Sequence, residues 1–352
     1  MNTTIIAFFN NKGGVGKTSL VYHLAWMYKD MGLRVVAADL DPQANLTAAF
    51  LDEERLEELW LGKDAHTVFN CIQPLLKGTG NIDNPYLEFI EEAQLSPFGG
   101  DLALLVGDLD LSGFEEDLSG QWSNCLDGKE RAFRVMSAFW RIMQKAASAH
   151  NADVILLDLG PNLGAINRAA LISADYVVVP LSPDLFSLQG LRNLGPTLRT
   201  WREEWQERLA KTSSPGKKGL ATDLQLPQGK MQPIGYVVLQ HSARLDRPVK
   251  AYNRWIARIP TVYHEDVLDQ PLTYNISVAD DRHCLALLKN YQSLMPMAQE
   301  ARKPIFHLKP ADGAIGAHTY AVRNVYREFE KLARAIAQRT GVKQLSTPTA
   351  PL

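Results

Sequence analysis

A short segment that is rich in glycine and ends in lysine, threonine and serine lies near the start of the 352-residue chain. Its members are Gly13, Gly14, Val15, Gly16, Lys17, Thr18 and Ser19, and Lys12 precedes them. Small residues let successive backbone N–H groups close around phosphate oxygens, and a lysine at the end of such a loop reaches the terminal phosphates. The threonine hydroxyl can bind Mg²⁺. The segment therefore predicts a site for a nucleoside triphosphate and magnesium.

Three aspartates follow apolar runs elsewhere in the chain. Asp39 and Asp41 come after residues 34–38, and Asp158 comes after residues 154–157. In an open α/β sheet the carboxyl ends of the strands form the edge at which ligands bind. A single Asp at a strand end more often caps a turn. Its occurrence together with the glycine-rich loop favours a role at the phosphate site.

These groups need a strand before the loop, a helix after it and further parallel strands beside it. Residues 4–9 form an apolar run, and residues 20–27 have a helical pattern. Further apolar runs alternate with helical stretches along the chain, which indicates a parallel α/β sheet. The strand candidates are Ile5–Phe9, Val35–Ala38, Leu102–Val106, Val154–Leu157, Tyr176–Val179 and Ile234–Leu239, and a helix is predicted over Tyr320–Gln338.

The loop departs from the common phosphate-loop pattern because Asn11 stands where a glycine is usual and Lys12 adds a second lysine. This loop, with three further motifs, resembles the ParA/MinD family of deviant Walker-A ATPases, and within it the ParA branch that partitions plasmids and chromosomes. The four motifs are K-G-G-V-G-K-T at 12–18, D-L-D-P-Q at 39–43, I-L-L-D-L-G-P at 155–161 and A-D-Y-V-V-V-P at 174–180.

The resemblance implies roles for the residues that match the motifs. ATP and Mg²⁺ are the implied cofactors, and Lys12, Lys17 and Asp41 are the implied catalytic residues. In the family, the counterpart of Asp41 positions the attacking water and the counterpart of Lys12 crosses a two-fold interface to the partner's nucleotide. Thr18, Asp39 and Asp158 are the implied metal-site residues, with Asp158 acting through water. The chain is thus expected to form a homodimer when ATP is bound and to hydrolyse ATP slowly.

DNA binding is expected at a basic stretch that resembles the family's DNA-binding loop. Its candidates are Arg244, Arg247, Lys250 and Arg254, of which the last three are spaced for one helical face. Because the formal net charge is −2, DNA contact must come from a local patch of this kind. An ordinary charged helix face is the alternative interpretation. A ParB-like or other cargo adaptor that stimulates hydrolysis is the further partner implied by the resemblance.

The predicted fold is a doubly wound, mostly parallel α/β sheet with helices on both faces, in one domain over residues 1–340. Insertions relative to the family pattern are expected at about 51–131, 211–233 and 261–302, followed by a flexible tail at 341–352. The acidic run 52–58 is interpreted as a solvated helix face. With 46% hydrophobic residues, the chain can bury a large core.

Cysteine content and the absence of a long apolar stretch favour a cytoplasmic protein without a membrane contact. The resemblance to the ParA family implies that it is nucleoid-associated. Cys71, Cys125 and Cys284 form no CxxC motif, so no cysteine-bound metal and no iron–sulfur site is expected. Two other functions are weighed. A MinD-like membrane switch would need an amphipathic basic helix at the extreme C-terminus, and a metabolic ligase or reductase would need a substrate motif. A ParA-like component of another system, such as phage defence or organelle positioning, also fits the motifs.

Overall fold

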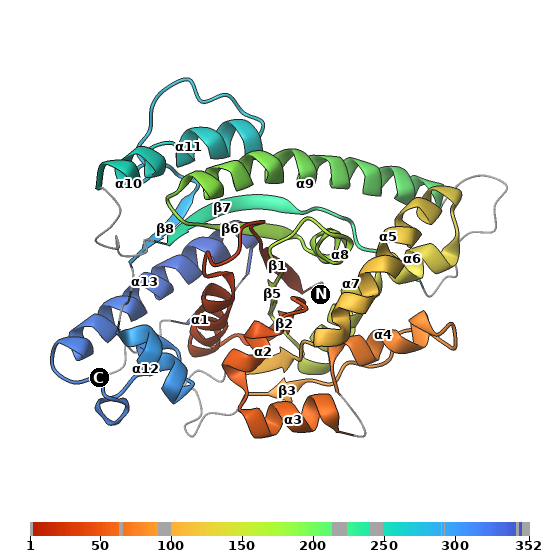
Figure 1. Cartoon of the computed structure of the whole chain (residues 1–352), viewed down its shortest axis with the longest axis horizontal. Helices are drawn as coiled ribbons and strands as arrows, with labels where there is room; N and C mark the ends of the chain where they lie inside the picture. Colours follow the sequence, from red (N-terminus) through yellow and green to blue (C-terminus); the bar gives the residue numbers. More distant parts are fainter. Residues whose placement is uncertain are drawn as a thin grey trace.

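A single eight-stranded sheet organises the chain in a computed structural model (Figure 1). The strand order is β3-β4-β2-β5-β1-β6-β7-β8, and all neighbours are parallel except β3 and β4. The structure describes residues 3–62, 66–90, 100–212, 224–239, 249–289, 291, 293–342 and 345–346.

The strands are β1 Thr4–Phe8, β2 Arg34–Asp39, β3 Glu88–Phe89, β4 Asp101–Leu105, β5 Val154–Asp158, β6 Tyr176–Leu181, β7 Gln232–Leu239 and β8 Cys284–Leu288. The α-helices of the N-terminal half are α1 Lys17–Asp30, α2 Asn45–Phe50, α3 Glu53–Leu61, α4 Val68–Leu76, α5 Phe114–Asn124, α6 Glu130–Met136 and α7 Ala138–His150. Those that follow are α8 Ala165–Ser173, α9 Leu185–Lys211, α10 Val249–Ile256, α11 Ile259–Val262, α12 Leu294–Ala301 and α13 Ala317–Thr340.

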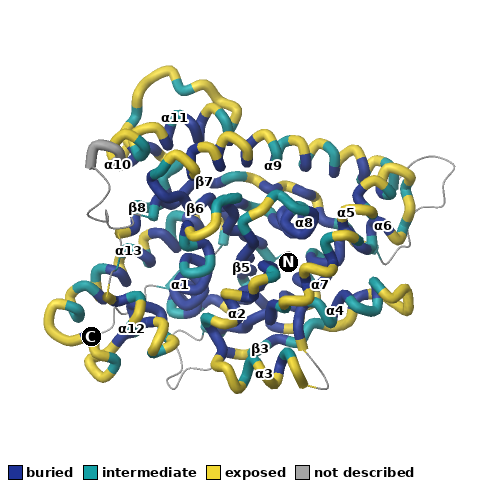
Figure 2. The backbone as a smooth tube through the Cα atoms, viewed as in Figure 1, coloured by how far each residue is buried: buried dark blue, intermediate teal, exposed yellow. Residues whose placement is uncertain are grey.

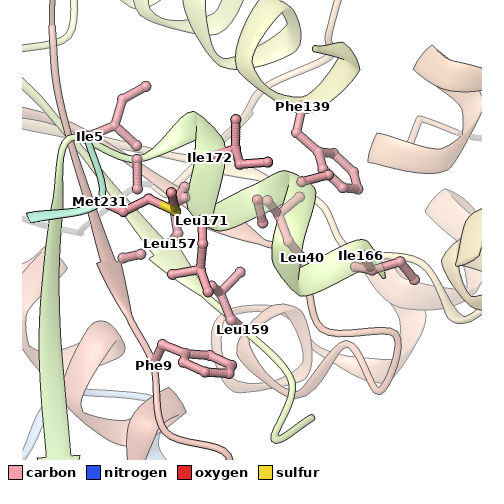
Figure 3. Packing of buried hydrophobic residues seen from close by; sticks show 14 of the residues in the cluster. Ile5, Phe9, Leu40, Phe139, Leu157, Leu159, Ile166, Leu171, Ile172 and Met231 are labelled. Carbon is pink, nitrogen blue, oxygen red and sulfur yellow. The ribbon is translucent and has the colours of Figure 1, made fainter. Parts of the chain in front are cut away.

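Both faces of the sheet are buried, because alternate residues of each strand enter different cores. In β1, Ile5 and Ala7 pack with helices α4 to α9, whereas Ile6 and Phe8 pack with α1, α2, α12 and α13. The buried strands lie between these two layers of helices, and exposed residues lie mainly on the outer surfaces of the helices (Figure 2). The first core joins strand residues to α7 and α8 through Phe139, Leu157 and Ile172, as Figure 3 shows.

All six strand candidates are confirmed, with boundaries that differ by at most two residues. The helix predicted over Tyr320–Gln338 is α13, and the acidic run forms α3, in which Leu59 is the buried residue. Two strands, β3 and β8, were not predicted from the sequence. β3 has only two residues, and β8 lies at the edge of the sheet with several half-buried residues, so its short apolar run gives no clear period.

The segments expected as insertions contribute to this one sheet and its helical layers. Residues 51–131 contain α3, α4, β3, β4 and α5, and residues 261–302 contain β8 and α12. Part of 211–233 and most of the expected tail at 341–352 fall outside the described residues. Within the described ranges, no helix combines the length and the apolar character needed to cross a membrane.

Candidate nucleotide-binding site

The topology brings the predicted motifs to one edge of the sheet. β5 lies between β2 and β1, and Asp158 on β5 is in register with Asp39 on β2 and Phe8 on β1. The glycine-rich loop follows β1 directly and leads into α1. Two of the predicted carboxyl groups and the loop therefore occupy adjacent strand ends, as the sequence indicated.

The loop adopts a conformation that requires glycine at two positions. Gly14 and Gly16 have φ angles of 70° and 78°, in the left-handed region that side chains with a Cβ disfavour. A Cβ on Gly16 would also lie 2.8 Å from Cδ1 of Leu239 at the end of β7. Val15 between them is fully buried and anchors the loop to the core. Gly16 directly precedes α1, so the loop ends at the positive end of that helix.

Asn10 fixes the beginning of the loop, a role that the sequence analysis missed. Its side-chain amide donates to the Pro180 carbonyl on β6 at 2.7 Å, and its side-chain oxygen accepts from the backbone N–H of Lys12 at 2.9 Å. The Lys17 ammonium group donates to the backbone carbonyls of Asn10 and Lys12, at 3.2 and 3.3 Å. These bonds hold Lys17 across the loop.

The Lys17 side chain is buried beside acidic groups. The residue is only 7% exposed. Burial lowers the pKa of its ammonium group, and the nearby carboxyl groups of Asp158 and Asp41 oppose that decrease. A buried cation that the loop holds in place is suited to neutralise phosphate oxygens, because its charge is weakly screened.

Asp158 offers a test of whether the site fits magnesium. Both of its carboxylate oxygens are buried, and neither has a hydrogen-bond partner of normal geometry among the described residues. Burial, and then the neighbouring Asp39, raise the pKa of Asp158, while the Thr18 hydroxyl lowers it. An unpartnered carboxylate beside a hydroxyl suits a hydrated Mg²⁺ ion, which keeps several waters and uses few protein ligands. The described residues contain no group of three or more His, Cys, Asp or Glu side chains arranged to hold a metal. Mg²⁺ at nucleotide sites is usually bound by one or two carboxylates together with substrate phosphates.

Asp39 and Asp41 have different surroundings although one residue separates them. The carboxylate of Asp39 accepts from the Thr47 N–H and hydroxyl, both at 2.8 Å, and from the Asp41 N–H at 3.3 Å. Burial raises the pKa of Asp39, and its hydrogen bonds with Thr47 partly offset the effect. Asp39 thus fixes the start of α2. Asp41 instead lines the cavity above the loop, where it could orient a water molecule.

A cavity of about 740 Å³ covers the loop. The glycine loop, Asp41 and Pro161 line part of it, and Met295, Gln299 and Arg302 of the α12 region form a further wall. A smaller hollow of about 130 Å³ adjoins it between α1 and the apolar side chains of β7 and β8. The α12 wall was missed in the sequence because residues 261–302 match no family motif, and its side chains have no spacing that indicates phosphate binding.

Lys12 lies at the rim of the site and is paired within its own chain. Its ammonium group forms an ion pair with Asp184, whose other oxygen accepts from the Ser187 N–H at 2.9 Å and caps α9. The Lys12 and Asp184 side chains are 26% and 13% exposed. Leu185 and Phe186, which follow Asp184, are 49% and 71% exposed. The rim therefore combines a cation, an anion and exposed apolar surface.

The predicted DNA-binding residues are only partly described. Arg244 and Arg247 lie outside the described residues, and of Lys250 only the backbone in α10 is described. Arg254 is exposed, with its guanidinium 5.0 Å from the centre of the Trp255 ring. Arg258 lies 5.4 Å from the same ring. The structure thus places one of the four candidates on an exposed surface.

A strand, a glycine loop and a helix that together bury a lysine beside two carboxyl groups define a P-loop nucleotide-binding protein. The chain belongs to the ParA/Soj group of P-loop ATPases, because the family model described as "AAA domain" matches residues 3–211.

A comparison with curated proteins finds relatives that are similar in sequence over more than half of this chain. The chain is 32% identical over 209 residues to Protein IncC of Escherichia coli, a match that covers 58% of this chain and 47% of that protein. The chain thus spans about half the length of this relative.

Solved structures share the fold over nearly the whole chain. Protein DIP2308 from Corynebacterium diphtheriae has a TM-score of 0.67 at 24% identity, covering 96% of this chain and 99% of that one. The structure of pNOB8 ParA bound to nonspecific DNA has a TM-score of 0.55 at 16% identity, covering 97% and 100%. Both comparisons show the α/β fold of P-loop ATPases.

The first testable consequence concerns His23, a buried residue of α1 that lines the cavity. Its Nδ1 donates to the Ser19 carbonyl at 2.7 Å, and its Nε2 accepts from the Ile305 N–H at 3.1 Å. Burial lowers its pKa from 6.5 to about 4, so the unfolded chain binds more protons between these values. The stabilisation that His23 provides is complete above pH 6.5 and is lost as the pH falls toward 4.

We expect this residue to lower the free energy of unfolding by about 2 kcal/mol between pH 7 and pH 5. Urea unfolding of the wild type and of His23→Gln at both pH values measures the effect. His283, whose pKa burial also lowers to about 4, remains in both proteins, so the difference in pH dependence isolates His23. Equal pH dependence in the two proteins would contradict the assignment.

The second consequence concerns Lys17. Lys17→Ala removes the buried cation that the loop holds across its backbone, and we expect ATP affinity to fall at least about a hundredfold while the fold is kept. Titration calorimetry with Mg-ATP measures the affinity, and circular dichroism checks the fold. Lys77→Ala, at an exposed lysine just beyond α4, is the matched control and should bind like the wild type. ATP affinity within a factor of three of the wild type in Lys17→Ala would refute the site.

Proposed function

We propose that this chain binds Mg-ATP, dimerises in the ATP-bound state, hydrolyses ATP slowly and binds DNA without sequence preference, and that this cycle positions or partitions a plasmid, chromosome or other cargo. The observation that carries the proposal is the pair of lysines in one loop. Lys17 is buried across the loop, whereas Lys12 stands at the rim, where a second molecule could reach it.

Different residues of the site have different roles in the proposed hydrolysis. Phosphoryl transfer depends mainly on positioning and charge neutralisation. Lys17 and the loop N–H groups bind the phosphates, Thr18 and Asp158 hold the metal ion, and Asp41 orients the attacking water. Magnesium, when bound, neutralises charge on the phosphate oxygens. Lys12 adds a second cation from the partner molecule.

Dimerisation requires Lys12 to leave Asp184. The side chains of this ion pair are partly exposed, so its separation costs little compared with the gain from contact with a triphosphate. The exposed side chains of Leu185 and Phe186 lie beside the pair and offer apolar surface for a two-fold contact. Each molecule of such a dimer would donate one lysine and receive one.

Binding to nonspecific DNA is supported by the exposed arginines of the α10 region and by the fold shared with the DNA-bound pNOB8 ParA. The chain has a formal net charge of −2, so a single copy offers few phosphate contacts. Two copies in one rigid dimer would double them. A nucleoid-associated location follows from this proposal, and a ParB-like adaptor would couple the cycle to the cargo.

A membrane-positioned function receives less support from the structure. The apolar stripe of α13, including Val325, Phe329 and Ile336, is buried against the sheet and α1. A stripe that packs on its own domain is not available for a bilayer surface.

The proposed roles of Lys12 in dimerisation and of Asp41 in hydrolysis can be tested separately. We expect Lys12→Ala to bind ATP within about threefold of the wild type but to remain monomeric and to lose at least about 90% of its hydrolysis. Asp41→Ala should form an ATP dimer that does not hydrolyse. Light scattering and phosphate release with Mg-ATP measure both properties. Identical oligomeric states for the two variants would refute the scheme.

DNA binding by the dimer is tested through its salt dependence. Each lost phosphate contact reduces the slope of log affinity against log salt by about 0.9, so Arg244→Ala should reduce it by about 1.8 per dimer. ATPase activity without DNA should stay close to that of the wild type. Arg323→Ala, at an exposed arginine of α13, is the control and should leave the slope unchanged. The proposal fails if the ATP-loaded wild type does not bind duplex DNA at low salt.

A further inference from the structure

Glu115, at the start of α5, caps another helix that lies next to the nucleotide site. Its Oε1 accepts from the Ala165 N–H at 2.5 Å and its Oε2 accepts from the Ile166 N–H at 2.8 Å. Ala165 and Ile166 are the first two residues of α8. A carboxylate at this position satisfies two N–H groups that lack partners within the helix and interacts favourably with its positive end.

The approach of Glu115 to the loop before α8 leaves no room for a side chain at Gly164. A Cβ there would lie 2.6 Å from Oε1 of Glu115 and 2.8 Å from Oδ1 of Asn162. The same Asn162 oxygen accepts from the Gly164 N–H at 2.9 Å. The loop and the carboxylate are therefore packed as one unit.

A second contact joins the same two helices. The Arg168 guanidinium of α8 lies 4.3 Å from the centre of the Trp122 ring of α5, within the range of a cation–π interaction. Trp122 in turn donates from Nε1 to Glu204 of α9 at 3.1 Å. α5 is thus anchored to α9 and contacts α8 at two points along its length.

The start of α8 is connected to the cavity through Asn167. This buried residue donates from Nδ2 to the carbonyl of Gly160 at 2.9 Å and to the carbonyl of Asn162 at 2.7 Å. Gly160 is packed against the residue expected to orient water, since a Cβ there would lie 3.1 Å from Oδ1 of Asp41. Pro161 lines the cavity. The position of α8 thus fixes the loop that lies beside Asp41 and the cavity.

We propose that Glu115 is a positioning residue for ATP hydrolysis: by capping α8 it holds the loop 159–164 against Asp41. This inference rests on the proposed ATPase function. The glycine loop and Lys17 bind ATP through other elements, so the loss of Glu115 affects the hydrolysis rate and leaves ATP affinity nearly unchanged. α5 thereby gives the segment 51–131 a direct connection to the catalytic step.

The test compares Glu115→Gln with Glu116→Gln, a change of the same type at the exposed neighbouring position of α5. Gln keeps the shape of the side chain but removes its charge and places a donor amide against one of the two N–H groups of α8. Hydrogen exchange of the amides in 160–166 without nucleotide is the first readout, and we expect at least about threefold faster exchange in Glu115→Gln alone.

The second readout separates binding from catalysis. Glu115→Gln should lower kcat about three- to tenfold per ATP-binding molecule, with the Kd for Mg-ATP within about twofold of the wild type. A lower melting temperature with unchanged kcat, or unchanged exchange in 160–166, would overturn the proposal, because a purely structural cap predicts these results.

Two further outcomes are also decisive. If Glu115→Gln does not fold, Glu115→Asp keeps the charge, shortens the side chain by one methylene and should show the same split between kcat and Kd to a smaller degree. If the wild type binds ATP without hydrolysing it, the proposed function fails and no catalytic step remains for Glu115 to position. The positioning role of Glu115 is then refuted as well, although the hydrogen-exchange data would still show whether Glu115 caps α8.

Discussion

The burial of one ammonium group beside carboxyl groups is the constraint on which this structure depends. Lys17 is almost inaccessible, and the two carboxyl groups that act most strongly on it belong to Asp158 and Asp41. A buried charge needs nearby charges or donors and acceptors. The backbone carbonyls of the loop accept its hydrogen bonds, so the loop, β2 and β5 must all be in place before the cation is stable. The order of the central strands satisfies this condition.

The three aspartates of the site show how surroundings, rather than residue type, assign function. Asp39 accepts three hydrogen bonds and joins β2 to α2. Asp158 is as deeply buried but its oxygens lack partners of normal geometry, which leaves them available for a ligand. Asp41 faces the cavity. The same carboxyl group therefore stabilises the fold at one position, is suited to a metal ion at the second and lines the cavity at the third.

The sequence predicted the central part of the fold because strong local signals coincide there. β1, the glycine loop and α1 follow one another without interruption, and the buried strands β2, β5, β6 and β7 have long apolar runs. Other features of the site depend on contacts between residues that are far apart in the sequence, so no local sequence pattern predicts them. Asp184 looks like an ordinary helix cap, and nothing in the sequence indicates its ion pair with Lys12. Glu115 lies in the acidic run Glu115–Asp117, in which the next residue, Glu116, is exposed. The α12 wall has neither a motif nor a periodic pattern that points to a nucleotide.

The distance along the chain between the two walls of the cavity bears on how the protein is made. The glycine loop is complete after residue 19, whereas Met295 of α12 and Arg302 directly after it line the same cavity. During synthesis, the ribosome must therefore release most of the polypeptide before the cavity can close. Chains of this size acquire native packing in stages, and unpaired sheet edges on partly made chains promote aggregation. β8, the edge strand that precedes α12, is formed by the same late segment. Completion of the sheet and closure of the cavity are thus one late event in the biogenesis of this protein.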